Sequence, residues 1–219
     1  MLYPVNDLFE TIQGEAKYTG TPSYFIRLQG CPVGCAWCDT QFTWYSDPRQ
    51  IVAQPIILKK ELEDFHFGEF TDKDLLDVVN KASAKHVVIT GGEPCLYDLN
   101  DLCDTLTNNG YTVQIETSGT HEVKAPDNVW VTVSPKVDMP GQFKLVRQAI
   151  ERANEIKMPI GKQKDIDNLN DLIKEYNIDV DIWLQPLSQS NKATQLCVEQ
   201  SIKNNWKISV QTHKYINQK

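Results

Sequence analysis

The residues best suited to chemistry are three cysteines, Cys31, Cys35 and Cys38, which lie within eight residues of one another. Their spacing is C-x3-C-x2-C, and the aromatic Trp37 directly precedes the third. A structural metal site or a fully ligated iron–sulfur cluster takes four ligands, and no fourth cysteine lies nearby in the sequence. Three thiolates on one loop can hold three corners of a cubane and leave one iron open to a small molecule. The pattern therefore predicts a catalytic site.

Composition and charge restrict the class of protein. With 219 residues, 41% of them hydrophobic and 23% charged, we expect a single globular domain over 1–219. No apolar run approaches the ~20 residues of a membrane span, and the first residues do not resemble a signal peptide, so we expect a cytoplasmic protein without a membrane partner. The net charge of −7 argues against nucleic acid and favours a small-molecule substrate.

The use of cysteine agrees with that location. Six cysteines in such a chain favour metal or redox chemistry over a disulfide framework. Cys103 and Cys197 fall in amphipathic helical patterns and are expected to pack as small apolar residues. Cys95 is also expected to pack as a small apolar residue, although it follows a predicted active-site turn.

The elements that must position the cysteine loop alternate between strands and helices, which indicates a mostly parallel sheet and an incomplete (β/α) barrel of six or seven strands. The predicted strands are Tyr24–Leu28, His86–Thr90, Thr112–Glu116, Val129–Val133, Glu155–Met158, Asp181–Leu184 and Lys207–Gln211. The predicted helices are Asp72–Ala82, Leu99–Asn109, Phe143–Asn154, Ile166–Glu175 and Lys192–Asn204. Thr71 or Asp72 is expected to cap the first helix, and Gly110 to end the second.

Unusual polar motifs follow these strands, where the active sites of such folds gather. They are expected to converge on one rim, and they are Gln29-Gly30-Cys31, Gly91–Pro94, Thr117–Gly119, Ser134–Lys136, Gln185–Ser188 and, after the last strand, Thr212–Lys214. The aromatic-rich stretch 41–70 interrupts the alternation. It is either an insertion that shapes the site or contacts a partner subunit, or a surface excursion with its own small apolar cluster.

The cysteine loop, Trp37 and the Gly91-Gly92-Glu93-Pro94 turn together resemble the radical SAM superfamily. The resemblance implies that the three cysteines hold a [4Fe–4S] cluster whose open iron binds S-adenosylmethionine. A zinc loop could mimic the cysteines, but it does not call for the second motif. The residues implied in binding S-adenosylmethionine are Trp37, Cys38, Asp39, Gly91, Gly92, Glu93, Ser134, Pro135, Lys136, Gln185, Pro186, Leu187 and Ser188.

The resemblance narrows to the 7-carboxy-7-deazaguanine synthase family and extends from about Leu8 to Tyr215. It is carried by Gln13-Gly14-Glu15, Arg27, Cys38-Asp39-Thr40, Gln114–Thr120, Ser134-Pro135-Lys136 and Gln211–Lys214. It implies a lyase that uses an adenosyl radical to contract the ring of 6-carboxy-5,6,7,8-tetrahydropterin to 7-carboxy-7-deazaguanine, with loss of ammonia, in queuosine precursor biosynthesis. It also implies Mg²⁺, a flavodoxin- or ferredoxin-type reductant and a homodimer.

The same resemblance assigns roles to single residues. It implies that Thr40 is the Mg²⁺ ligand, and it assigns no acid–base residue because the adenosyl radical carries the chemistry. The residues implied in substrate binding are Ile12, Gln13, Gly14, Glu15, Arg27, Thr90, Glu116, His213 and Lys214. Four residues of the predicted site also have a plainer interpretation: a structural ion pair for Arg27, a salt bridge for Glu116, a capping role for Thr40 and a surface carboxylate for Glu93.

Two alternative functions remain open from the sequence. A glycyl-radical-enzyme activase or another radical SAM enzyme would share the cysteines and the glycine turn, but would not call for Gln13-Gly14-Glu15 or Thr40. A zinc-binding structural protein is the more remote alternative, and it would be colourless after anaerobic reconstitution with iron and sulfide.

Overall fold

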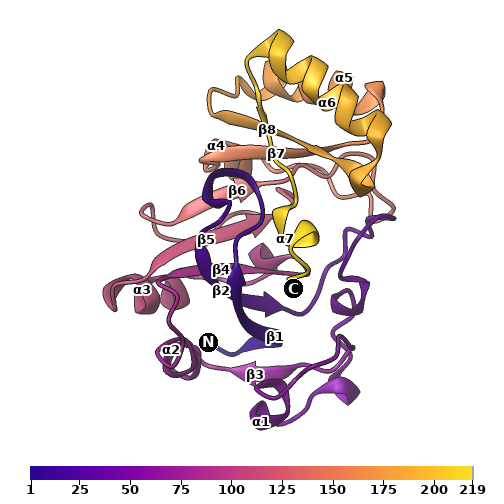
Figure 1. Cartoon of the computed structure of the whole chain (residues 1–219). Helices are drawn as coiled ribbons and strands as arrows, with labels where there is room; N and C mark the ends of the chain where they lie inside the picture. Colours follow the sequence, from indigo (N-terminus) through magenta and orange to yellow (C-terminus); the bar gives the residue numbers. More distant parts are fainter. Residues whose placement is uncertain (219) are drawn as a thin grey trace.

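A computed structural model describes residues 1–218 and shows one nine-stranded sheet (Figure 1). The strand order is β3-β1-β2-β4-β5-β6-β7-β8-β9, so the sheet has two free edges and is not a closed barrel. β1 runs antiparallel to both of its neighbours, and the strands from β2 to β9 run parallel. This is the predicted architecture, a mostly parallel and incomplete barrel.

The elements follow one another as the sequence predicts, with two additional strands, β1 and β3, and two additional short helices, α1 and α7. The strands are β1 (Tyr3–Ile12), β2 (Pro22–Leu28), β3 (Gly68–Phe70), β4 (His86–Gly91), β5 (Thr112–Thr117), β6 (Trp130–Val133), β7 (Glu155–Ile160), β8 (Asp181–Pro186) and β9 (Lys207–Ile208). The α-helices are α1 (Gln54–Ile57), α2 (Asp72–Val79), α3 (Asn100–Asn108), α4 (Arg147–Glu151), α5 (Gln163–Tyr176), α6 (Asn191–Asn204) and α7 (Thr212–Tyr215).

Strands β1 and β3 correct the predicted count of six or seven strands. In β1 a bulge between Val5 and Asp7 breaks the alternation of buried and exposed side chains that marks a strand. β3 lies inside the stretch 41–70 and pairs with β1, where Tyr3 is the partner of Phe70. Phe70 is fully buried in the main hydrophobic core. The end of the aromatic-rich stretch is therefore an edge of the sheet rather than an excursion with a separate cluster.

The C-terminal end is also different from the prediction. The last strand ends at Ile208 rather than Gln211, and His213 and Lys214 lie on the short helix α7 instead of at the end of a strand. The helix predicted over Phe143–Asn154 is confined to α4, because the preceding backbone is extended and the amide of Val146 donates to the carbonyl of Gly119 at 2.9 Å.

The helices are positioned by the caps and apolar faces that the sequence indicates. Thr71 and Asp74 form a capping box at the start of α2, which buries Leu75 and Val79 against the sheet. Cys103 on α3 and Cys197 on α6 are fully buried, as predicted. No helix within residues 1–218 has the length and apolar character to cross a membrane.

Candidate functional site

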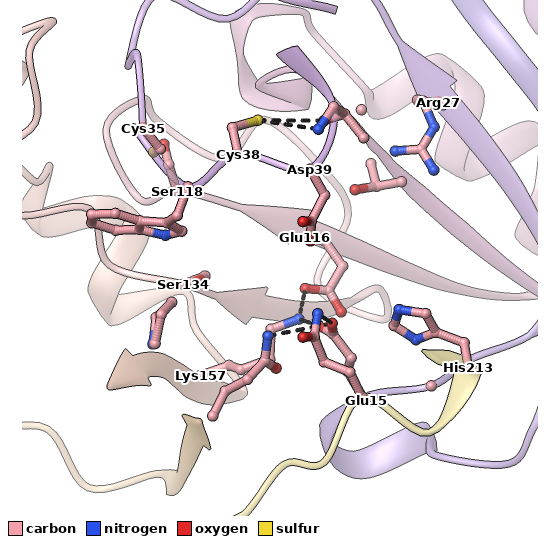
Figure 2. Close-up of a pocket in the computed structure, with 18 of the residues that line it drawn as sticks. Glu15, Arg27, Cys35, Cys38, Asp39, Glu116, Ser118, Ser134, Lys157 and His213 are labelled. Atoms are coloured by element: carbon pink, nitrogen blue, oxygen red, sulfur yellow. Dashed lines mark hydrogen bonds and ion pairs between the residues drawn. The ribbon is translucent and has the colours of Figure 1, made fainter. Parts of the chain in front are cut away.

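A cavity of about 350 Å³ lies at the carboxyl ends of the parallel strands (Figure 2). All of the residues predicted for the site line this cavity, with the exception of Glu93 and Pro135. Eight further residues also line it. Thr117, Ser118 and Gln211 belong to motifs that the sequence indicates, whereas Phe9, Phe25, Val33, Lys157 and Pro159 were not predicted as site residues. The topology therefore brings motifs from both ends of the chain to one rim, as the alternation of strands and helices predicts.

The cysteine loop is an irregular segment held by the residues that follow it. The amides of Gly30 and Cys31 donate to the carbonyls of Thr43 and Trp44 at 2.7 and 2.9 Å. The indole Nε1 of Trp44 donates to the sulfur of Cys38 at 3.4 Å. Trp44 was not predicted as a site residue, and its position in the aromatic stretch six residues after Cys38 is the only signal for it.

The three thiols suit a cluster better than a single ion. All of Cys31, Cys35 and Cys38 are free and line the cavity. Among the described residues no three Cys, His, Asp or Glu side chains converge closely enough to hold one metal ion. A tetrahedral zinc site needs such convergence, whereas a cubane takes each thiolate on a different iron atom. The donor set therefore fits a [4Fe–4S] cluster with one open iron.

The glycine turn packs directly on the cysteine loop. A Cβ atom on Gly92 would lie 2.0 Å from the carbonyl oxygen of Gly30, and one on Gly91 would lie 2.2 Å from that of Leu28. Gly91 also has φ +127°, which side chains disfavour. The two glycines are thus needed for backbone packing, whatever ligand the turn binds. The turn and the cysteine loop form one structural unit.

Glu93 holds the glycine turn in place. It is 1% exposed, so the interpretation of a surface carboxylate is wrong. Its carboxylate accepts hydrogen bonds from the amides of Cys95 and Ser118 at 2.9 and 2.8 Å and from the hydroxyl of Thr117 at 2.6 Å. The hydroxyl of Ser118 donates to it as well. Glu93 therefore fixes the turn after β4 to the end of β5 and does not line the cavity.

Three charged residues, Glu15, Glu116 and Lys157, lie together at the bottom of the cavity. We call this trio the polar floor. The ammonium of Lys157 lies 2.5 Å from an oxygen of each carboxylate, and Figure 2 shows the three side chains pointing toward one another. Lys157 was not predicted. In the sequence, Lys157 is marked only as a charged residue between Ile156 and Met158, in a strand that is expected to be buried.

The polar floor rests on a buried network of amides and hydroxyls. Gln114 is fully buried on β5 and donates to Glu116 at 3.1 Å and to Thr132 at 2.9 Å. The side chain of Gln13 donates to the oxygen of Gln114 at 3.1 Å and to Glu116 at 3.3 Å. The sheet thus holds Glu116 through its neighbours as well as through Lys157.

Burial and charge shift the titration of the polar floor. Burial opposes the ionisation of Glu15, but the ammonium of Lys157 outweighs it and lowers the pKa of Glu15 to about 2. Burial raises the pKa of Glu116 to about 7, with the charge of Glu15 adding to the effect and Lys157 offsetting only part of it. Burial would discharge Lys157, yet the two carboxylates raise its pKa.

Arg27 and Thr40 complete the wall between the floor and the cysteine loop. The Arg27 guanidinium lies over the ring of Phe9, 5.4 Å from its centroid, and its buried Nε has no hydrogen-bond partner among the described residues. Burial lowers the pKa of Arg27, while the carboxylate of Asp7 opposes that shift. Thr40 precedes a short 3-10 helix (Gln41–Thr43) but makes no side-chain cap, and its hydroxyl lies 3.6 Å from the sulfur of Cys38.

The C-terminal tail closes one side of the cavity. The amide and the hydroxyl of Thr212 both donate to the carbonyl of Gly14 at 3.0 Å. His213 packs against Gly14 so closely that a Cβ there would lie 2.1 Å from its Nδ1. Lys214 lies 3.3 Å from the carboxylate of Asp39 in the cysteine loop. The tail therefore joins residues 13–15 to the loop that carries the thiols.

Known proteins resemble the chain over almost its whole length. Curated proteins named 7-carboxy-7-deazaguanine synthase from Escherichia coli K12 and from Buchnera aphidicola are 52% and 45% identical to the chain, over 99% of both sequences in each case. The chain belongs to the 7-carboxy-7-deazaguanine synthase family. A crystal structure of QueE from Escherichia coli matches with a TM-score of 0.94 at 51% identity, over 96% of this chain and 94% of that one. No model of a protein family matches the chain. The family resemblance predicted from the motifs is thus confirmed, and membership makes the chain an enzyme of this synthase family.

Proposed function

We propose that the chain converts 6-carboxy-5,6,7,8-tetrahydropterin to 7-carboxy-7-deazaguanine with loss of ammonia, acting as a radical SAM lyase. Membership of the synthase family supports this reaction. The single observation that carries it is one cavity lined by three free thiols, a double-glycine turn, an arginine and the two glutamates of the polar floor. A glycyl-radical activase acts on a protein partner and would not call for the carboxylates that line the floor of this cavity.

The proposal assigns the cofactors to the upper part of the cavity. Cys31, Cys35 and Cys38 would hold the [4Fe–4S] cluster, and S-adenosylmethionine would lie along the glycine turn, Trp37, Asp39, Ser134 to Lys136 and Gln185 to Ser188. When bound, the pair supplies a carbon radical that takes a hydrogen atom from the carboxylate-bearing carbon of the substrate. Lys136 shapes this wall because its ammonium donates to the carbonyl and the hydroxyl of Ser134 at 2.9 and 2.5 Å.

The chain's own residues bind and orient the substrate. Arg27 offers a planar fork of donors for the substrate carboxylate, and the buried Nε without a partner supports that assignment. Thr40 would place Mg²⁺ beside the same carboxylate, since a hydroxyl oxygen suits a hard cation. Gln13, Glu15 and Glu116 face the polar pterin ring, with the backbone of residues 12–14 and Thr90 alongside. A wrong ring would leave these buried groups without hydrogen bonds.

Exclusion of water is the remaining task of the protein. Phe9 and Phe25 stack with ring centroids 5.2 Å apart and form an apolar wall of the cavity. His213 and Lys214 close it from the C-terminal side. A carbon radical in such a site is kept from water and stray hydrogen donors.

The reaction also needs an electron from outside the chain. We propose a flavodoxin- or ferredoxin-type donor, on the ground that the proposed cluster must be reduced before the reaction can start. The homodimer that the family resemblance implies stays a prediction, to be checked by light scattering of the purified protein.

The function is tested by anaerobic reconstitution with iron and sulfide, followed by chemical reduction and incubation with the pterin, S-adenosylmethionine and Mg²⁺. We expect a brown protein with three thiolate-ligated irons per cluster and 7-carboxy-7-deazaguanine detected by mass spectrometry. A fully clustered enzyme that forms no deazaguanine would refute the reaction. Thr40→Val should keep the cluster and weaken the response to Mg²⁺, and an unchanged response would show that Thr40 is not the ligand.

A further inference from the structure

Lys157 stands between two carboxylates that come from distant parts of the chain. Glu15 follows β1, Glu116 is on β5 and Lys157 is on β7, so three separate elements meet at this point. The side chains of Lys157, Glu15 and Glu116 are 6%, 15% and 13% exposed. The ammonium lies 2.5 Å from Oε2 of each glutamate. The contact is therefore a shielded, bifurcated ion pair rather than a surface salt bridge.

The other oxygen of each glutamate is held by a different set of amides. Oε1 of Glu15 accepts from Gln211 at 2.8 Å and from Gln185 at 3.3 Å. Oε1 of Glu116 accepts from the side chains of Gln114 and Gln13 at 3.1 and 3.3 Å. Among the residues that the structure describes, only Lys157 bonds both carboxylates. It thus determines how far apart the two acceptors stand.

The charge of Lys157 also affects the protonation of the two glutamates. Two carboxylates and one ammonium carry one net negative charge in a place that is shielded from water. Without the ammonium, two like charges would face each other there, and at least one would take up a proton. A protonated carboxyl group donates one hydrogen bond and accepts fewer, so it would no longer match a ligand edge that consists of N–H donors.

We propose that Lys157 is the positioning residue that sets the spacing and the ionised state of Glu15 and Glu116, so that both accept hydrogen bonds from the N–H groups of the substrate's aminopyrimidinone ring. The proposal rests on the proposed function, because it takes the pterin as the ligand of the floor. Lys157 acts through the two glutamates, and its own ammonium is committed to them.

The pH dependence of substrate binding is set by the charged groups that act on the polar floor. Besides the trio, these are Glu155 on β7, His213 on α7 and Lys136 after β6, whose charges act on Glu116, Glu15 and Lys157 respectively. None of these three takes the place of the ammonium between the two carboxylates. Removal of Lys157 would therefore move the loss of substrate binding, which follows protonation of Glu116, to higher pH.

The test uses the reconstituted enzyme and the variants Lys157→Gln and Lys157→Arg. For Lys157→Gln we expect KM for the pterin to rise at least about tenfold, as when one partner of a buried charge pair is removed. The KM for S-adenosylmethionine and the cluster absorbance should stay as in the wild type. The low-pH limb of pterin KM should shift upward by about one pH unit or more, and Lys157→Arg should return it toward the wild type because the charge is kept.

The matched control is Lys207→Gln, which removes an exposed Lys–Asp pair between β9 and β8 on the same sheet. It should change either KM by less than about twofold. An unchanged pterin KM and pH limb in Lys157→Gln would overturn the proposal, and so would an equal rise in KM for both ligands or a pH limb that Lys157→Arg does not restore. If the wild type itself forms no deazaguanine, the proposed function fails, whereas a working wild type with an unaffected Lys157→Gln refutes the role of Lys157 alone.

Discussion

The cysteine loop and the polar floor line the same cavity, but they are built in different ways. The loop from Cys31 to Cys38 has no regular secondary structure, and weak contacts to the sulfur of Cys38 come from Trp44 and the amide of Thr40. The floor is fixed on strands β5 and β7, and charged hydrogen bonds of 2.5 Å join its members. The floor is formed by the fold itself, whereas we expect the conformation of the loop to depend on the proposed cluster.

The strongest way to break this comparison is to remove a thiol. Cys38→Ala should abolish the cluster and reduce product formation to background, because the loop has no fourth thiolate that could replace Cys38. The free energy of unfolding of the cluster-free protein should change by less than about 1 kcal/mol, since the sulfur makes only weak hydrogen bonds. Iron content, activity and urea denaturation measure the three effects.

Cys103→Ala is the matched control for that variant. Cys103 is fully buried on α3, so it should lose about 1 kcal/mol of stability and keep the full iron content and activity. A cluster-free Cys38→Ala protein that loses several kcal/mol would show that the loop belongs to the folding unit, against the comparison.

The floor should respond in the opposite manner. Gln114→Met keeps the volume but leaves polar groups of Gln13, Glu116 and Thr132 without their buried partner, so we expect a loss of about 2 kcal/mol or more in the free energy of unfolding. Gln195→Met on the exposed face of α6 is the control and should stay within about 0.5 kcal/mol of the wild type. Urea denaturation that shows equal stability of both variants would contradict a rigid floor.

The pH dependence of stability sharpens the description of the floor. The pKa of Glu116 is about 7 in the folded protein against an ordinary 4.5, so between these values the folded state binds the proton that the unfolded state has lost. Stability should therefore fall by about 3 kcal/mol as the pH rises through this interval. Glu116→Gln should remove that decline.

Glu15 provides the internal reference for the same titration. Its pKa is lowered to about 2, so its contribution to stability is present above pH 4.5 and is lost as the pH falls toward 2. The acid loss should persist in Glu116→Gln. Thermal melts between pH 3 and pH 8 would count against this account if the slope from 4.5 to 7 were the same in both proteins.

The smallest effect is expected where the two regions are joined by the tail. Lys214 pairs with Asp39 at 3.3 Å, with side chains that are 33% and 70% exposed. Lys214→Ala should raise KM for the substrates by no more than about fivefold, since exposed ion pairs contribute about 1 kcal/mol or less. High salt should bring the wild type close to the variant. A loss of a hundredfold would mean that the tail, and not the floor, dominates binding.

The sequence predicts the loop better than the floor. The cysteines and the glycine turn are local patterns, and the alternation of strands and helices is enough to place them on one rim. Lys157 and Gln114 lie in strands that were predicted correctly, yet their contacts depend on which strands lie next to each other. The only local indication of these two residues was a polar side chain in an otherwise apolar strand. That indication does not identify the partner of the side chain on another strand.

Strands β1 and β3 were missed for similar reasons. β1 is interrupted by a bulge near Asn6, and β3 is three residues long and is defined by its pairing with β1. His213 and Lys214 were placed correctly at the site but on the wrong kind of element, because Ile208 is followed by a helical turn rather than by a longer strand. Local propensity does not include such long-range pairing.

The most direct test of the account follows a deuterium label placed on the carboxylate-bearing carbon of the pterin. The family resemblance implies that S-adenosylmethionine is re-formed after a hydrogen atom has returned to the product. If the cysteine loop and the polar floor serve one reaction in one cavity, the reduced enzyme should therefore form 7-carboxy-7-deazaguanine, and deuterium should appear in the recovered S-adenosylmethionine. Formation of the product with no deuterium in S-adenosylmethionine, or labelling without any deazaguanine, would contradict it.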